Sequence, residues 1–292
     1  MGTRTGGYKI GFRRGWSEWQ RDLPSLAAWA RSTGFDAIDL GHASAGDVGF
    51  LKEQGLSLGS VDLVDGGGIL AKDPARRKEA IERNVEYIKE AGALGAKAFF
   101  TVVGAQDADQ PRADNYAAAV EGYGPIAEAA ASVGGGLAIE GWPGGGHQLA
   151  NLCCTPETTR RFLADVGPGA GLNYDPSHLI RLGVDHIRFL KEFAGRVNHV
   201  HGKDTEIDSE AVYEYGLYQS AAFAKPHGFG EHVWRYTIPG SGLARWTEIF
   251  RILKDTGFAG MVSVELEDEN FNGTTEGEQA ALLHSLDFLK SA

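Results

Sequence analysis

Hydrophobic and polar positions along the chain follow a regular rhythm, in which short apolar runs alternate with longer amphipathic stretches. The short runs predict eight strands, at residues 8–12, 37–41, 57–63, 97–104, 136–141, 171–175, 197–201 and 261–267. The amphipathic stretches predict eight helices, at residues 19–33, 45–54, 74–94, 113–133, 155–166, 186–193, 245–256 and 276–290. Because this rhythm runs to the C-terminus without a linker, residues 1–292 are expected to form one domain.

The order of these elements predicts an α/β fold, a single (β/α)₈ TIM barrel. Several helices end on a glycine directly before the next strand, as at Gly34, Gly55 and Gly257. Glycine is favoured there because the residue that ends a helix often takes the left-handed conformation. Such short turns suit a closed barrel. A doubly wound sheet is the main alternative, but the chain lacks the GxGxxG turn of a nucleotide site. The glycine runs 66–68 and 144–146 are interpreted as flexible loops after strands, not as phosphate cradles.

One connection, after strand seven, is much longer than the others. It covers residues 205–244 and carries several aromatic side chains: Tyr213, Tyr215, Tyr218, Phe223, Phe229, Trp234 and Tyr236. Loops of this length are usually functional lids or disordered segments, and the aromatic content argues against disorder. We therefore expect a lid over the mouth of the barrel, with a contact in a dimer as the alternative.

Composition and charge exclude several kinds of partner. The chain has 28 Lys and Arg against 39 Asp and Glu, a formal net charge of −11, which argues against a nucleic-acid partner. It has no apolar stretch of membrane-spanning length and no signal-peptide pattern, so we expect a cytoplasmic protein that does not bind membranes. The adjacent Cys153 and Cys154 have neither redox nor zinc-site spacing and are expected to be reduced. A homo-oligomer is expected.

Four polar residues end consecutive predicted strands, where the active site of a barrel forms. Glu140, Asp175, His201 and Glu265 end strands five, six, seven and eight. Each alone has an ordinary explanation, such as a helix N-cap or a satisfied core histidine. Together, however, three carboxylates at one mouth would repel one another unless a cation were present. This ligand set predicts one divalent metal, Mn²⁺ first, with Mg²⁺ or Co²⁺ as alternatives.

Neighbouring residues on strand seven extend this candidate site. His199 lies two residues before His201, so both side chains point the same way, and His199 is expected to lie deeper as a supporting or layer residue. Lys203 and Asp204 follow His201 directly. They are expected either to contact substrate or to orient His201, and a surface salt bridge is the alternative.

The strand endings resemble a known group of enzymes. Ala-Ile-Glu, Asn-Tyr-Asp-Pro-Ser-His, His-Val-His-Gly-Lys-Asp and Ser-Val-Glu, with the later Ile-Pro-Gly-Ser-Gly-Leu-Ala-Arg-Trp, resemble the sugar phosphate isomerase/epimerase group of the xylose-isomerase-like barrels. That group includes ketose 3-epimerases, inosose dehydratases and enzymes that act on 3-keto glycosides. The resemblance covers strand five to the C-terminus. It implies that Glu140, Asp175, His201 and Glu265 bind metal and that His178 binds substrate.

Endonuclease IV, a related barrel, resembles the chain at the same five positions but adds histidines for a three-zinc site. One of these ends strand four, and an Asp-x-His pair follows strand seven. Here strand four ends Thr-Val-Val-Gly, and residues 204–245 contain no Asp-x-His. A nuclease is therefore disfavoured, and a single metal is expected.

The resemblance implies a metal-dependent isomerase or epimerase that removes a proton next to the carbonyl of a keto sugar through an enediolate. Glu140 and Glu265 would be the two bases. Trp142, Trp234 and Trp246 are candidate sugar-stacking surfaces, with simple packing as the alternative. The second hypothesis is a lyase or dehydratase that acts by β-elimination on a 3-keto glycoside or inosose. The third hypothesis is a barrel that only binds sugar. No basic cluster marks a phosphate pocket, which favours an unphosphorylated substrate.

Overall fold

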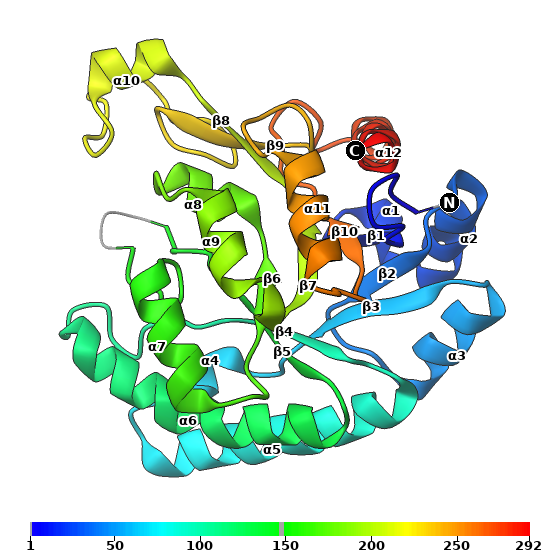
Figure 1. Cartoon of the computed structure of the whole chain (residues 1–292), viewed down its shortest axis with the longest axis vertical. Helices are drawn as coiled ribbons and strands as arrows, with labels where there is room; N and C mark the ends of the chain where they lie inside the picture. The colour runs from blue at the N-terminus through cyan, green and yellow to red at the C-terminus, as the bar shows by residue number, and fades with distance from the viewer. Residues whose placement is uncertain (1, 146–148) are drawn as a thin grey trace. The chain divides into compact units, whose positions relative to one another are not determined.

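The computed structural model describes residues 2–145 and 149–292. Its barrel strands are β1 (Ile10–Arg13), β2 (Ala37–Leu40), β3 (Ser57–Asp62), β4 (Ala98–Val102), β5 (Gly136–Glu140), β6 (Leu172–Tyr174), β7 (Val197–Gly202) and β10 (Val262–Val264) (Figure 1). They form a closed barrel in the order β1-β10-β7-β6-β5-β4-β3-β2. The predicted TIM barrel is confirmed.

The helices also follow the predicted order. They are α1 (Glu18–Arg21), α2 (Leu23–Thr33), α3 (Ala45–Glu53), α4 (Gly66–Ile69), α5 (Pro74–Leu94), α6 (Arg112–Ser132), α7 (Pro156–Val166), α8 (Pro176–Arg181), α9 (His186–Phe193), α10 (Ser209–Tyr215), α11 (Trp246–Asp255) and α12 (Thr275–Ser291). Gly34, Gly55 and Gly257 have φ values of 89°, 75° and 78°, so the predicted left-handed caps are present.

Two local predictions, one of a helix and one of a loop, were wrong in detail. The predicted helix 19–33 is interrupted at Asp22, whose side chain accepts a hydrogen bond from the backbone of Ser25 and so starts a new helix, with Pro24 in its first turn. The glycine run 66–68 is not a flexible loop, because Gly66–Ile69 forms α4, capped by Asp65. In the second glycine run, residue 146 lies outside the described residues.

The chain folds as two compact units, of which the first consists of Met1–Ala37, Asp175–Ala194 and His201–Ala292. In this unit β1 pairs in parallel with β10, and α12 packs against both strands. The two ends of the chain meet here, because the backbone N–H of Arg4 donates to the Lys290 carbonyl at 3.0 Å. Asp175, His201 and Glu265 all lie in segments of this first unit.

The second unit consists of Ile38–Tyr174 and Gly195–Val200. Its strands β3 to β7 pair in parallel, and α5 and α6 run side by side (Figure 1). Every residue of β5 is buried, as expected for a parallel strand that is covered on both faces. In the register of β5 and β6, Glu140 lies opposite Asn173.

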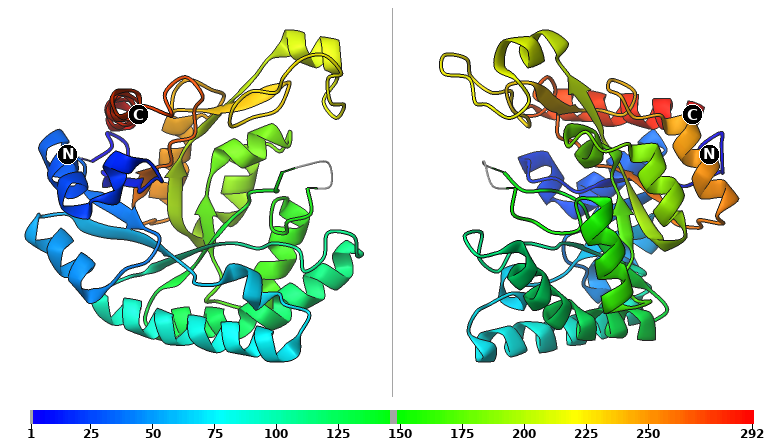
Figure 2. Two further views of the ribbon diagram at one scale, coloured as in Figure 1. Left: turned by 180° about the vertical axis from the view of Figure 1, so that it is seen from behind. Right: turned by 60° about the vertical axis from the view of Figure 1, so that its left-hand side comes forward.

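The long segment 205–244 is more regular than the sequence predicted. It contains most of an antiparallel ribbon of β8 (Asp204–Ile207) and β9 (Trp234–Thr237), with α10 between them. None of the α10 residues is buried, and Figure 2 shows this helix projecting from the rest of its unit. Tyr213, Tyr218 and Phe223 are also exposed. The ribbon is anchored by the buried Thr205, Tyr236 and Thr237, and the lid role of the segment stays a prediction.

Within residues 2–145 and 149–292, no helix combines the length and the apolar character that crossing a lipid bilayer requires.

Candidate active site

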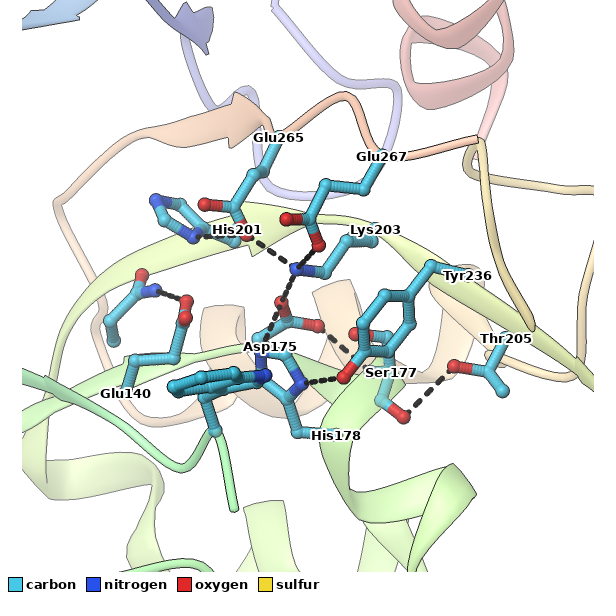
Figure 3. Close-up of polar contacts among 12 residues, drawn as sticks. Glu140, Asp175, Ser177, His178, His201, Lys203, Thr205, Tyr236, Glu265 and Glu267 are labelled. Atoms are coloured by element: carbon cyan, nitrogen blue, oxygen red, sulfur yellow. Dashed lines mark hydrogen bonds and ion pairs between the residues drawn. The ribbon is translucent and has the colours of Figure 1, made fainter. Parts of the chain in front are cut away.

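Lys203 is the centre of a polar cluster in the first unit. It lies between β7 and β8, and its side chain is 1% exposed. Its Nζ atom lies 2.5 Å from Glu265 Oε2, 2.9 Å from Glu267 Oε2 and 3.3 Å from Asp175 Oδ2 (Figure 3). The alternative of a surface salt bridge is therefore wrong for Lys203. A buried ammonium group instead joins three carboxylates.

Glu265 is surrounded by nitrogen atoms. Besides Lys203, His201 Nδ1 lies 3.3 Å from its Oε2 and Arg13 Nε lies 3.4 Å from its Oε1. Burial acts to raise the pKa of Glu265, but Lys203, His201 and Arg13 outweigh it and hold that pKa well below its ordinary value. Glu265 is therefore ionised at neutral pH, the form that a base or a metal ligand needs.

Asp175 has two roles, one for each oxygen. It follows β6 directly, and its Oδ1 accepts a hydrogen bond from the backbone N–H of Ser177 at 2.8 Å, which caps α8. Its Oδ2 is directed to the cluster, 3.3 Å from Lys203 Nζ and 3.3 Å from His178 Nε2. The N-cap explanation therefore holds for Oδ1, and Oδ2 stays directed to the polar cluster, so the metal-binding role of Asp175 stays a prediction.

His178 is held by a second layer of polar groups. Its Nδ1 shares a hydrogen bond of 2.6 Å with Tyr236 Oη, which also accepts one of 2.8 Å from Arg181 Nη1. Burial raises the pKa of Tyr236, against the opposing charges of Lys203 and Arg181, so its hydroxyl stays protonated. This network fixes the imidazole with Nε2 towards Asp175.

These residues fit a divalent metal. One ligand atom from each of Asp175, His178 and Glu265 lies within 4.8 Å of the others, and His201 adjoins Glu265. Asp175 Oδ2 is buried and makes no hydrogen bond among the described residues, although His178 Nε2 and Lys203 Nζ each lie 3.3 Å from it. Two carboxylate oxygens and imidazole nitrogen are donors that Mn²⁺, Mg²⁺ or Co²⁺ accept. The close set includes His178, which the sequence assigned to substrate.

The second unit places Glu140 where the sequence predicted it. It is the last residue of β5 and is 4% exposed. Asn173 Nδ2, from the opposite position on β6, donates a hydrogen bond of 2.7 Å to Glu140 Oε2 (Figure 3). This bond orients the carboxylate at the carboxyl end of its strand.

His199 forms a separate pair in the second unit. Its Nε2 lies 2.8 Å from Asp39 Oδ2, and Asp39 Oδ1 accepts a hydrogen bond from the backbone N–H of Ser60 at 3.1 Å. Both side chains of the pair are buried. The supporting role expected for His199 stays a prediction.

The three candidate stacking tryptophans differ in environment. Trp246 is 2% exposed and packs against Phe250, so the stacking interpretation is wrong for it. Arg181 covers one face of Trp234, with its guanidinium carbon 4.1 Å from the ring centre. Trp142 is 38% exposed and follows Glu140 by two residues. Trp142 and Trp234 retain exposed surface for a ligand.

Sequence reasoning missed several residues of these clusters. Asp39 carried a signal, because it is the one acidic residue of the otherwise apolar strand Ala-Ile-Asp-Leu. Arg13 is the last residue of β1, just as candidate ligands lie at the ends of their strands. Its position in the sequence could therefore have marked it as a candidate site residue. Tyr236 carried no such signal, because β9 belongs to a ribbon that the apolar rhythm did not predict.

Comparisons with known proteins agree with this fold. The family model described as xylose isomerase-like TIM barrel matches residues 27–292. YfiH of Bacillus subtilis (strain 168) is 36% identical over 143 residues, which are 48% of this chain and 43% of that protein. An inosose dehydratase of Glaesserella parasuis serovar 5 is 25% identical over 284 residues, 87% of this chain and 88% of that enzyme.

A solved structure gives the same result. The 3-keto-D-glucoside 4-epimerase YcjR of E. coli superimposes with a TM-score of 0.68 over 97% of this chain and 99% of that one, at 15% identity, which shows the fold alone. The chain aligns with less than half the length of the first curated relatives that it matches. Because the family model covers most of the sequence, from residue 27 to its end, the chain belongs to the xylose isomerase-like TIM barrel family.

Proposed function

We propose that this protein is a divalent-metal-dependent isomerase or epimerase that removes a proton next to the carbonyl of a keto sugar through an enediolate. The observation that carries the proposal is the convergence of Asp175 and Glu265, whose ligand oxygens lie within 4.8 Å of each other, with His201 Nδ1 3.3 Å from Glu265. Structural neighbours named as L-ribulose 3-epimerase and D-psicose 3-epimerase support it at the level of the fold.

We place Glu140, Asp175, His201 and Glu265 as the metal ligands. All four lie at or next to the carboxyl ends of strands, which share one rim in a parallel barrel. When bound, the metal would polarise the substrate carbonyl and offset the negative charge that develops there. Manganese is the ion we expect first, because this donor set mixes carboxylates with an imidazole.

The chain's own residues then handle protons and position the substrate. Glu265, kept ionised by its neighbours, removes the proton from the carbon next to the carbonyl. Glu140 returns a proton to the opposite face, which inverts that carbon. His178 donates to a substrate oxygen, with Tyr236 fixing its ring. We further propose that residues 205–244 cover the substrate during this reaction.

Elimination is the second candidate, and the inosose dehydratase that aligns with 87% of this chain favours it. The first proton transfer is the same. The electron pair of the broken C–H bond then expels a hydroxyl or an alkoxy group from the neighbouring carbon, and that group leaves with a proton. Lys203, which is buried beside Glu265, is the acid that we expect to supply this proton.

Product analysis separates the two reactions. The manganese-loaded protein is incubated in D₂O with ketoses, 3-keto glycosides and inosose, and the products are followed by NMR. Epimerisation yields an isomer with deuterium at the inverted carbon, whereas elimination yields an unsaturated or dehydrated sugar and the released group. Full activity after chelation would contradict the metal, and absence of turnover and of deuterium exchange on every substrate would contradict both reactions.

A further inference from the structure

The segment that leaves β10, residues 265–269, is acidic at four of its five positions, Glu-Leu-Glu-Asp-Glu. Its first two carboxylates, Glu265 and Glu267, belong to the cluster around Lys203. Its last two, Asp268 and Glu269, bind residues of the long segment 205–244 instead. One short run of chain therefore contacts both the proposed base and the segment that we expect to cover the substrate.

Asp268 anchors the end of β9. It is 1% exposed, and its Oδ2 accepts hydrogen bonds from Thr237 Oγ1 at 2.6 Å and from the backbone N–H of Ile238 at 3.2 Å. Its Oδ1 lies 3.0 Å from Arg235 Nη1. The backbone N–H of Asp268 donates to Asn272 Oδ1 at 2.8 Å, so the anchor is itself held in place. Asp268 therefore fixes β9 to the exit of β10.

Tyr236 lies between the anchored residues of β9 and reaches the polar cluster. Its Oη shares a hydrogen bond of 2.6 Å with His178 Nδ1 (Figure 3), and the Lys203 ammonium lies 4.5 Å from the centre of its ring. A hydrogen bond weakens steeply when its geometry changes. Because a strand moves with its neighbouring residues, the hold of Asp268 on β9 also keeps Tyr236 within reach of His178.

Glu269 holds a second part of the long segment. Its Oε2 accepts a hydrogen bond from the backbone N–H of Gly228 at 2.8 Å, and its Oε1 lies 2.7 Å from His227 Nδ1. Burial acts to raise the pKa of Glu269, but the Gly228 N–H and His227 outweigh it and lower that pKa, so the carboxylate is ionised at neutral pH.

Phe229 directly follows the residues that Glu269 holds. Its φ of 55° is one that residues other than glycine rarely adopt, and such a conformation persists only where the surrounding structure imposes it. Phe229 lines the cavity that opens beside Glu265, and its carbonyl accepts a hydrogen bond from the Tyr236 N–H at 2.9 Å. The two anchored stretches are therefore joined to each other, and one of them forms a wall of that cavity.

We propose that Asp268 and Glu269 are positioning residues, which fix residues 227–238 beside the reaction centre. Asp268 keeps Tyr236 on His178, and Glu269 keeps Phe229 at the wall of the cavity. Movement over the substrate is then confined to residues 208–226, which include α10. The expected effects on turnover rest on the proposed function, whereas the attachment of the segment does not.

Hydrogen exchange followed by mass spectrometry tests the attachment of β9 without turnover. Thr237→Val removes one hydrogen bond of Asp268 with little change of shape, and Asp268→Asn removes the charge. Both should raise the exchange of backbone amides in residues 234–238, by about threefold or more for Asp268→Asn. Glu206→Gln is the matched control, because Glu206 pairs with Arg235 at 2.7 Å but is half-exposed, and it should change this exchange by less than about 1.5-fold.

The same measurement tests Glu269. Glu269→Ala should raise exchange in residues 227–230 by about threefold or more, and Glu269→Gln, which keeps an acceptor for the Gly228 N–H, should recover part of the protection. Unchanged exchange at residues 234–238 in both Asp268→Asn and Thr237→Val, or at residues 227–230 in Glu269→Ala, would overturn the inference.

Turnover separates positioning from a purely structural role. On a keto sugar that the wild-type protein converts, Asp268→Asn should lower kcat by about tenfold, and Thr237→Val by less, because the ring of His178 is no longer fixed. Glu269→Ala should instead raise KM by about fivefold and change kcat by less than about twofold, because Phe229 then leaves the wall of the cavity. A loss of folded protein would lower the apparent kcat of each variant and leave KM unchanged.

The two levels of the proposal fail in different ways. Raised exchange with wild-type kcat and KM on a substrate that is turned over would reject Asp268 and Glu269 as positioning residues. Raised exchange in the variants, without turnover of any keto sugar by the wild-type protein, would reject the proposed function and support the attachment of residues 227–238.

Discussion

Two imidazole–carboxylate pairs, each with a histidine of strand β7, have opposite environments. In the second unit, His199 pairs with Asp39 at 2.8 Å, and the second oxygen of Asp39 is taken by a backbone N–H. In the first unit, His201 lies 3.3 Å from Glu265, which also faces Lys203 and Arg13 and lines a cavity. The first pair is enclosed by protein, whereas the second gathers more charge than one pair requires and opens to a ligand.

This difference shows which of the two pairs is accessible to a ligand. An enclosed pair lowers the cost of burying its own polar atoms and has little left to offer a substrate. The cluster around Glu265 holds three carboxylates beside the ammonium of Lys203 and the guanidinium of Arg13, so one negative charge is left for a metal ion. The predictions below test this contrast, from the largest expected effect to the smallest.

Replacing Lys203 should have the largest effect on stability. Lys203→Met leaves Asp175, Glu265 and Glu267 without their shared ammonium, and removing one partner of a buried ion pair costs about 3–5 kcal/mol. We expect this loss in denaturant unfolding of the metal-free protein, with Mn²⁺ restoring part of it because bound metal stabilises the native state. Lys191→Met, which removes a lysine from an exposed pair with Glu248, is the control. Equal stability of the Lys203 and Lys191 variants would contradict the central role of Lys203.

The proposed base should dominate catalysis. Glu265→Gln keeps a ligating oxygen but removes the proton acceptor, so turnover should fall by about 10² or more while weakened metal binding remains. Glu267→Gln is matched, since Glu267 also bonds Lys203 but is not a proposed base, and it should lose less than about tenfold. Rates are measured on metal-loaded protein. Near wild-type turnover by Glu265→Gln would reject this residue as the base.

Glu140→Gln tests the second face. If each glutamate serves one face of the sugar, deuterium exchange from D₂O should persist in one glutamine variant and vanish in the other for a given epimer, while both fail to complete epimerisation. The expected loss of turnover is again about 10². Exchange that is unchanged in both variants would show that another group moves the proton.

The enclosed pair should affect stability more than chemistry. Asp39→Ala leaves the buried His199 without its carboxylate partner, which costs about 1–3 kcal/mol. We expect that loss in thermal and denaturant unfolding, with kcat of the folded variant reduced by less than about tenfold. A loss of turnover as large as that of Glu265→Gln, at unchanged stability, would place Asp39 among the catalytic groups.

The smallest expected effect is that of Asp204 on the pH dependence of stability. Its carboxylate accepts hydrogen bonds from the backbone N–H groups of Thr205, Gly240 and Ala244, but burial outweighs them and raises its pKa to about 6. Because this pKa lies above that of an unfolded aspartate, the folded state holds the proton longer, and the contribution to stability decreases as pH rises from about 4 to 6. Asp204→Asn should flatten that decrease, by an amount on the order of 1 kcal/mol. An unchanged pH profile of unfolding would show that Asp204 is already ionised at pH 4.

The sequence by itself determined the barrel and the strand ends at which the candidate site residues lie. Apolar runs of strand length recur between amphipathic helices, and burial of β5 on both faces needs only such a run. Glu140, Asp175, His201 and Glu265 were recognised as candidates because they are polar residues at the ends of those apolar runs. A buried strand tolerates a charged residue only at its end or where the side chain has a partner.

Tertiary structure decided the partners of those residues. The sequence could not show that Lys203 is buried among three carboxylates, because the groups come from residues 175, 203, 265 and 267, and only folding brings them within ion-pair distance. It also could not separate Trp246, buried in packing, from Trp16, exposed in the cavity beside Glu265. The physical reason is that periodicity records which face a side chain takes, whereas electrostatic pairing and cavity shape depend on contacts between distant segments.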